Sequence, residues 1–227
     1  MTQDFPGAVL FDLDGTLVDT APDLTHALNW VLAQENCAPV SLDEVRHMVG
    51  KGARHLMRQA LQAAGLPPTD EKLDALLPVF LDHYGAHIAD DSRLFPGVRD
   101  VVEELAAAGV KLAVCTNKPE KLSRDLLGAL GVDGLFPTIV GGDSLDRRKP
   151  DPEHIFETLR RMGASAKDAV MVGDSINDIA AARDAGVPVI AVTFGYTDTP
   201  VVELGADLVI EDFAELVPAL RRLNGRV

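Results

Sequence analysis

Six short apolar runs recur along the chain, and a helix-like segment follows most of them. The runs cover residues 8–13, 110–115, 137–141, 168–173, 188–192 and 207–210. The first, second and fourth runs are continuously apolar rather than alternating, which is typical of central strands in a parallel sheet that is covered on both faces. The alternation of such strands with helices predicts a doubly wound α/β domain.

Proline and glycine residues mark the ends of the predicted helices. These helices cover residues 97–108, 119–130, 152–162, 176–185 and 212–223. Pro119 and Pro152 suit the first helical turn, where a missing backbone N–H costs nothing. Gly163 and Gly186 suit the position just past a helix C-terminus.

A long helical block interrupts this alternation directly after the first strand. Residues 20–91 read as successive helices with no convincing strand between them. Such a block predicts a small α-helical cap that is inserted over one end of the sheet. We therefore expect a core formed by residues 1–17 and 92–227, and a cap formed by residues 18–91.

The composition narrows the partners that the chain can have. It has 21 basic and 35 acidic residues, and the net charge of −14 argues against a nucleic acid or an anionic membrane as partner. A small anionic substrate remains compatible, because a few cations can gather locally. No long apolar span or signal peptide is visible, so we expect a cytoplasmic protein. Neither Cys37 nor Cys115 has metal-ligand neighbours, and we expect both to be reduced thiols.

Polar residues stand where the predicted strands end. In an open α/β sheet, ligands bind beyond the carboxyl ends of the strands. The residues found there, or just before the next helix, are Asp12 and Asp14, Thr116 and Asn117, Lys149, and Asp174 and Asp178. Carboxylates, a hydroxyl group and an ammonium group should therefore converge on one crevice.

Four short motifs carry a resemblance to a known family. The motifs are "FDLDGT" (11–16), "CTNK" (115–118), "RRKPDP" (147–152) and "GDSIND" (173–178). In order and spacing they resemble the four motifs of the haloacid dehalogenase superfamily, which implies a Rossmann-like core with a cap and phosphoryl-transfer chemistry. The stretches "TLVDTAPDL", "VGKGARHL" and "GGDSLDRRKPDP" most resemble the bacterial phosphatases of this superfamily that hydrolyse 2-phosphoglycolate.

The pair Asp12 and Asp14 suits a nucleophile and a proton donor. Alternate residues of a strand point to the same face, so both carboxylates can serve one substrate. Asp12 is expected to attack phosphorus and form an aspartyl phosphate. Asp14 is expected to protonate the leaving alkoxide and then to take a proton from the attacking water.

A divalent cation is expected beside the nucleophile. Two unit charges about 4 Å apart interact by about 4 kcal/mol at an effective dielectric constant near 20, so an unshielded carboxylate repels a phosphate strongly. The expected cofactor is Mg²⁺, held by the carboxylates of Asp12 and Asp174 and by the backbone carbonyl of Asp14. Asp178 is expected to bind metal-held water or to position Lys149, and helix capping is the structural alternative for this residue.

The remaining core residues are expected to bind the phosphoryl group. Lys149 would neutralise a phosphate oxygen and the nucleophile as charge moves. Thr116 offers a hydroxyl group and Asn117 offers a backbone N–H at a helix start. Lys118, the next residue, is expected to have an exposed side chain.

The cap is expected to supply the contacts that select the substrate. Lys51 lies between two glycines, and Arg54 would lie in the first turn of the next helix. These bases could bind a carboxylate of the substrate. A glycine-containing link between helices, with both bases in solvent, is the alternative interpretation.

Several other functions share parts of this pattern. A phospho-receiver domain would lack the second acid at position 14, and so would a dehalogenase. A sugar-phosphate mutase would carry a histidine where this chain has Leu24. Activity on pyrophosphate or on another small phosphate ester is compatible with the core motifs, and the chain could be a monomer or a dimer.

Overall fold

The first apolar run forms strand β1 (Ala8–Phe11), which lies in the middle of the sheet. The computed structural model describes residues 5–197 and 199–224. In it, β1 pairs in parallel with β4 (Lys111–Cys115) on one side and with β6 (Ala169–Gly173) on the other. Every residue of β1 is fully buried, which explains why the run is continuously apolar.

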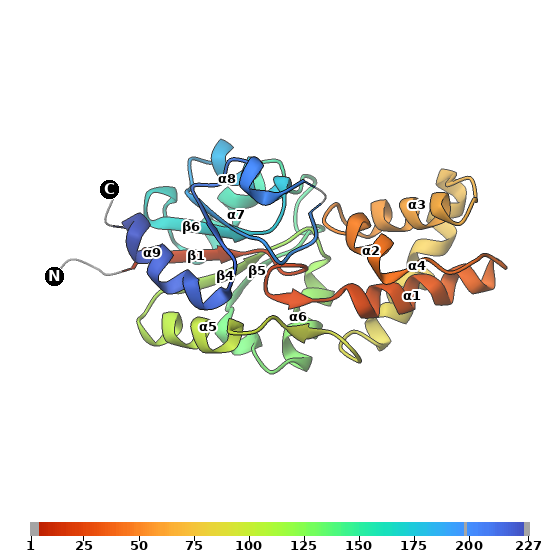
Figure 1. Ribbon diagram of the computed structural model, residues 1–227, viewed down its shortest axis with the longest axis horizontal. Helices are drawn as coiled ribbons and strands as arrows, with labels where there is room; N and C mark the ends of the chain where they lie inside the picture. Colours follow the sequence, from red (N-terminus) through yellow and green to blue (C-terminus); the bar gives the residue numbers. More distant parts are fainter. Residues whose placement is uncertain (1–4, 198, 225–227) are drawn as a thin grey trace.

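In the described part of the chain, six parallel strands form this sheet in the order β5-β4-β1-β6-β7-β8. Val9 and Phe11 point into one apolar cluster, and Ala8 and Leu10 point into another on the opposite face. Helices α7 and α8 cover one face of the sheet, and α5, α6 and α9 cover the other (Figure 1). The expected doubly wound α/β fold is therefore confirmed. The edge strands are β5 (Thr138–Val140) and β8 (Leu208–Ile210), and β7 (Val189–Val192) lies between β6 and β8.

The core helices lie close to their predicted positions. They are α5 (Val98–Ala107), α6 (Glu120–Ala129), α7 (Glu153–Met162), α8 (Ile176–Asp184) and α9 (Leu216–Asn224). Pro119 and Pro152 stand directly before α6 and α7. Gly163 ends α7 with φ of +60°, the left-handed conformation that glycine adopts without strain. The expected helix at 212–223 begins as a short 3₁₀ turn at Phe213–Glu215 and only then becomes α9.

The cap is a helical bundle with an apolar interior. Its helices are α1 (Ala21–Gln34), α2 (Leu42–Met48), α3 (Ala53–Ala63) and α4 (Asp70–Ala86). Leu28, Met57 and Phe80 are fully buried where these helices pack together. The bundle lies beyond the carboxyl end of β1, as Figure 1 shows.

Two short strands, which the sequence pattern did not indicate, link the core to the cap. The chain enters the cap through β2 (Val18–Asp19) and returns through β3 (Arg93–Leu94), and these two strands pair antiparallel. A strand of two residues is too short to show a period, so no pattern could have predicted either one. The domain boundaries at residues 17/18 and 91/92 stay a prediction.

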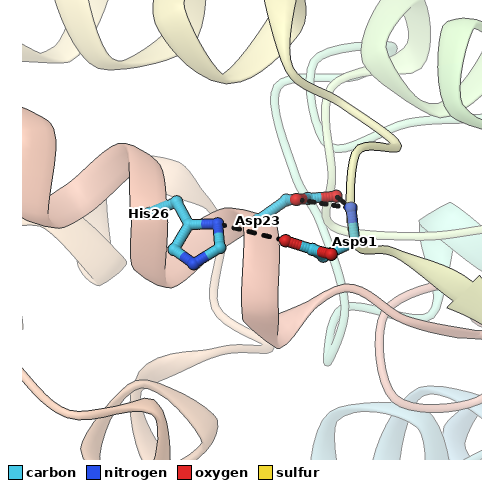
Figure 2. A group of neighbouring side chains, drawn as sticks. All are labelled: Asp23, His26 and Asp91. Carbon is cyan, nitrogen blue, oxygen red and sulfur yellow. Dashed lines mark hydrogen bonds and ion pairs between the residues drawn. The ribbon is translucent and has the colours of Figure 1, made fainter.

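Asp23 fastens the returning segment to the start of α1 at this link. Its buried carboxylate accepts hydrogen bonds from Asp91 N (2.9 Å), Ser92 N (2.8 Å) and Ser92 Oγ (2.6 Å). Figure 2 shows Asp23 and Asp91 side by side, with the His26 ring next to them. His26 Nδ1 lies 3.6 Å from Asp91 Oδ2. The His26 and Asp91 side chains are both more than half exposed, so this second contact contributes little.

The two cysteines are free thiols. Cys115 is buried in β4, and burial raises its pKa to about 11, which keeps the thiol protonated and unreactive. Cys37 is half-buried rather than buried, because it lies at the edge of the cap just past α1.

Replacing Asp23 by alanine should destabilise the protein by about 2 to 3 kcal/mol, because two buried donors of Ser92 and the partly buried N–H of Asp91 lose their acceptor. The free energy of unfolding in urea measures this effect. His26→Ala is the matched control, since it removes the exposed contact alone and should change stability by less than about 0.5 kcal/mol. Equal losses in the two variants would show that Asp23 is not the fastening group.

Candidate active site

The chain turns sharply where β1 ends, and this turn places the first motif. Asp12 N still donates to Val172 O at 2.9 Å, so position 12 continues the sheet. Gly15 then adopts φ of +86°. A methyl group at Gly15 would lie 2.6 Å from Asp174 Oδ2, so only glycine lets the first and fourth motifs approach this closely.

Lys149 joins two of the predicted acids. Its Nζ lies 3.2 Å from Asp12 Oδ1 and 2.6 Å from Asp178 Oδ1, and its side chain is 1% exposed. Burial alone would lower the pKa of Lys149, but the charges of Asp12 and Asp178 outweigh it and hold the pKa above its ordinary value. Asp178 also accepts hydrogen bonds from Ser175 N and Oγ, so it is fixed on both sides.

Asp12 keeps one oxygen available. Oδ1 accepts hydrogen bonds from Leu13 N at 2.7 Å and faces Lys149. Among the described residues none donates to Oδ2, and Asp12 lines a cavity between core and cap. This oxygen is therefore free to react with a ligand in the cavity.

Three carboxylates form a buried group that can hold a cation. Oxygens of Asp12, Asp174 and Asp178 lie within 4.8 Å of one another. Burial raises the pKa of Asp174 well above its ordinary value, and repulsion from Asp178 and Asp12 adds to this effect. Asp174 is oriented by Thr16 Oγ1 at 3.1 Å and by Tyr196 N at 2.6 Å.

A divalent cation fits this donor set. The ammonium group of Lys149 pairs with Asp12 and Asp178 but not with Asp174, so the three acids together have an excess of negative charge. Oxygen ligands of this kind are those that Mg²⁺ prefers. The residues present are thus compatible with a magnesium ion at Asp12 and Asp174.

Lys118 is buried, which contradicts the expectation of an exposed side chain. Its Nζ lies 3.1 Å and 3.3 Å from the two oxygens of Asp14 and 2.7 Å from Tyr84 Oη. Burial opposes the charge of Lys118, but Asp14 and Tyr84 raise its pKa to about 12. The partner Tyr84 comes from α4 of the cap, and no local sequence pattern signals a contact between segments so distant.

The predicted phosphate-binding pair lies at the end of β4. Thr116 is buried and lines the cavity together with Asn117. The Asn117 side chain donates through Nδ2 to Gly50 O at 2.8 Å and to Lys149 O at 2.9 Å. Asn177 Nδ2 donates to the same Gly50 carbonyl at 3.2 Å, so two core asparagines hold the cap loop.

The two cap bases that the sequence suggested lie away from this cavity. Arg54 forms ion pairs with Asp70, at 2.9 Å, and with Asp74. Lys51 is exposed and lines a second, wider cleft of about 270 Å³. The cavity itself is lined on this side by the backbone and small side chains of Gly50, Gly52 and Ala53.

The cavity has a polar floor and an apolar roof. The floor consists of Asp12, Asp14, Thr116, Asn117 and Lys118 from the core. The apolar lining comes mainly from the cap, with Leu24, Val49, Leu56, Phe80 and Leu81, and from Leu122 of the core. The free volume of the cavity is about 40 Å³, which is room for about three water molecules. The arrangement suits a small ligand whose charged group lies on the core side.

Comparisons with known proteins agree with this geometry. A family model described as haloacid dehalogenase-like hydrolase matches residues 9–192. A phosphoglycolate phosphatase of Caulobacter vibrioides is 50% identical over 95% of this chain and 92% of that protein. One of Agrobacterium fabrum is 50% identical over 93% of this chain and 91% of that protein.

Solved structures give the same result. The crystal structure of a predicted phosphoglycolate phosphatase from Haemophilus somnus superposes with a TM-score of 0.90 at 35% identity, covering 96% of this chain and 99% of that chain. The structure of CbbY from Rhodobacter sphaeroides in complex with phosphate has a TM-score of 0.80 at 28% identity, covering 93% of this chain and 96% of that chain.

The chain belongs to the haloacid dehalogenase-like hydrolases, and it is an enzyme of that family. The resemblance carried by the four motifs is thus confirmed. Within residues 5–197 and 199–224, none of the helices combines the length and the apolar character that crossing a membrane requires.

The metal-free protein should become less stable as the pH rises through the range in which Asp12 titrates. Burial raises the pKa of Asp12 from 3.8 to about 7, and the charge of Lys149 offsets this only in part. Between these values the folded protein keeps a proton that the unfolded chain releases, so the free energy of unfolding falls with rising pH.

In the presence of a chelator at about pH 8, Asp12→Asn should therefore be more stable than the wild type by about 2 to 4 kcal/mol. Urea unfolding of both proteins across the pH range measures the difference, which should vanish near pH 4. If Asp12→Asn is less stable than the wild type at high pH, the charged form of Asp12 does not destabilise the folded protein, and the prediction is wrong.

Proposed function

We propose that this enzyme is a Mg²⁺-dependent phosphoric monoester hydrolase that converts 2-phosphoglycolate to glycolate and phosphate. The observation that carries the proposal is the free Oδ2 of Asp12 at the floor of the cavity between core and cap, with Lys149 beside it and Asp14 two residues further on. The relatives of highest identity given above, which are named phosphoglycolate phosphatases, support the choice of substrate.

In the first half-reaction Asp12 is the nucleophile. Its Oδ2 forms a bond to phosphorus while the bond between phosphorus and the glycolate oxygen breaks. Asp14, protonated in the complex with substrate, gives its proton to the departing alkoxide, so that this oxygen of glycolate leaves as a neutral hydroxyl group. Lys149 and Thr116 bind the phosphoryl oxygens and stabilise the charge that develops on them.

In the second half-reaction water releases the phosphoryl group from Asp12. Asp14 is now a carboxylate, and it takes a proton from the water as the water oxygen attacks phosphorus. The bond between Asp12 and phosphorus breaks, inorganic phosphate leaves, and both acids return to their starting states.

The metal would be held by the carboxylates of Asp12 and Asp174 and by the backbone carbonyl of Asp14. When bound, Mg²⁺ supplies positive charge that offsets the repulsion between the nucleophile and the phosphate. Asp178 accepts a 2.6 Å hydrogen bond from Lys149, which supports a positioning role for it rather than direct metal ligation.

The cavity favours a small substrate and water as the final acceptor. A free volume of about 40 Å³ admits a two-carbon leaving group more readily than a sugar. Leu24 lines the cavity at the position where a mutase of this superfamily would have a histidine, and leucine cannot relay a proton. Asp14 beside the nucleophile favours hydrolysis over a stable phosphorylated receiver.

Asp12→Asn should lower kcat by at least about 10³-fold, because the amide cannot form the acyl phosphate. Rapid acid quench of wild-type enzyme with ³²P-labelled 2-phosphoglycolate should trap label on Asp12, and the variant should trap none. A panel of small phosphate esters and pyrophosphate, compared by kcat/KM, tests the substrate. Label on another residue, or a clearly better substrate in the panel, would contradict the corresponding half of the proposal.

Chelation of divalent cations should abolish turnover, and added Mg²⁺ should restore it. Asp174→Asn should raise the Mg²⁺ concentration that gives half-maximal rate by about 10-fold or more, since a charged ligand is lost. Asp70→Asn, which alters an exposed acid of the cap, is the matched control and should leave this concentration unchanged. Full activity in excess chelator would rule out the metal.

A further inference from the structure

We propose that Lys118, held by Tyr84 of the cap, binds the carboxylate of the substrate and thereby selects a phosphorylated hydroxy acid over an uncharged phosphate ester. The inference rests on the proposed hydrolysis at Asp12. It assigns substrate selection to a buried residue of the core that contacts the cap, in place of the cap bases Lys51 and Arg54.

The size of the substrate determines where its carboxylate can lie. In 2-phosphoglycolate three bonds separate the leaving oxygen from a carboxylate oxygen, so the two atoms are at most about 4 Å apart. Asp14 must contact the leaving oxygen in order to protonate it. The group that binds the carboxylate must therefore be an immediate neighbour of Asp14, and Lys118 Nζ lies 3.1 Å from Asp14 Oδ1.

Tyr84 has a donor to offer a ligand, and Lys118 can redirect one. An ammonium group has three N–H donors, and the structure gives it three acceptor atoms, which are the two oxygens of Asp14 and Tyr84 Oη. Tyr84 Oη accepts from Lys118, and no acceptor for the hydroxyl hydrogen of Tyr84 is found among residues 5–197 and 199–224. Both side chains line the cavity, so the O–H of Tyr84 can meet a ligand there, and an N–H of Lys118 can do so once one Asp14 oxygen turns to the leaving oxygen.

The environment makes this cation selective for an anion. The Lys118 side chain is 3% exposed and lies in a cavity whose other lining is largely apolar, including Leu24, Phe80 and Leu81. An anion that pairs with a buried ammonium group gains more than it would in water, whereas a neutral group there gains little. In addition, the N-terminus of α3, at Gly52 and Ala53, lines the same cavity and favours negative charge.

Other cations near the site have different partners. Lys149 faces Asp12 and Asp178, which places it at the phosphoryl end. Arg54 is paired with Asp70 and Asp74 on the cap surface. Among the described residues, Lys118 is the basic side chain that lines the cavity.

The test compares two substrates that differ in one group. In 2-hydroxyethyl phosphate, CH₂OH replaces the carboxylate of 2-phosphoglycolate, and the leaving oxygen is otherwise similar. The specificity ratio is kcat/KM for the acid divided by kcat/KM for the alcohol. Lys118→Met should lower this ratio by about 30-fold or more, and Tyr84→Phe by about 5-fold.

Two further variants complete the design. Lys121→Met makes the same substitution three residues along the chain on an exposed side chain of α6, and the ratio should not change. Lys118→Arg keeps the positive charge and should recover part of the ratio. Loss of Lys118 can slow turnover of both substrates through its effect on Asp14. Binding is therefore also measured by calorimetry in the Asp12→Asn background. There, Lys118→Met should weaken the binding of 2-phosphoglycolate more than the binding of 2-hydroxyethyl phosphate.

The outcomes separate this inference from the proposed function. Equal losses on both substrates, in rate and in binding, would show that Lys118 acts through Asp14 alone and would overturn the inference. A ratio that falls in Lys51→Met but not in Lys118→Met would overturn it in favour of the cap base. If the wild type does not hydrolyse 2-phosphoglycolate at all, the proposed function itself fails.

Discussion

The buried ion pair between Lys149 and the acids Asp12 and Asp178 is the contact on which the site depends. An ammonium group that is 1% exposed is stable only because two carboxylates surround it, at 3.2 Å and 2.6 Å. In return, the ammonium group allows Asp12 to remain in a water-poor site where burial raises its pKa to about 7. The sheet brings the two acids together, because β1 and β6 are neighbours and their carboxyl ends meet at one edge. The fold thus maintains an excess of negative charge that a bound cation can neutralise, and the bound cation can in turn attract a phosphate.

Core and cap contribute opposite chemistry to the cavity. The core supplies charged and polar groups on short, rigid turns after β1 and β4, whereas the cap supplies most of the apolar surface. This division lets the reacting groups keep one geometry while the cap excludes water and limits ligand size. Lys118 and Tyr84 form one of the polar contacts at which the two parts meet, at 2.7 Å. A carboxylate site at this point would need both the core and the cap to be complete.

Local patterns predicted the parts of the structure that depend on neighbouring residues. Continuous apolar runs predicted the parallel strands. The spacing of Asp12 and Asp14 predicted that both carboxylates would lie near one cavity after β1. Other features depend on contacts between distant segments, and these were missed. Lys118 is buried because Tyr84, 34 residues earlier in the chain, meets it, and Arg54 is withdrawn because Asp70 and Asp74 compete for it. The strands β2 and β3 are too short for any period to show, although they carry the connection between core and cap.

The carbonyl of Gly50 is bonded by two side chains at once, Asn117 after β4 and Asn177 in α8. Because both asparagines converge on a single oxygen, the loop cannot leave one of them and remain seated on the other without distorting its geometry. Any movement of the cap away from the core at this loop would therefore break both hydrogen bonds at the same oxygen, although the two asparagines lie 60 residues apart in the chain.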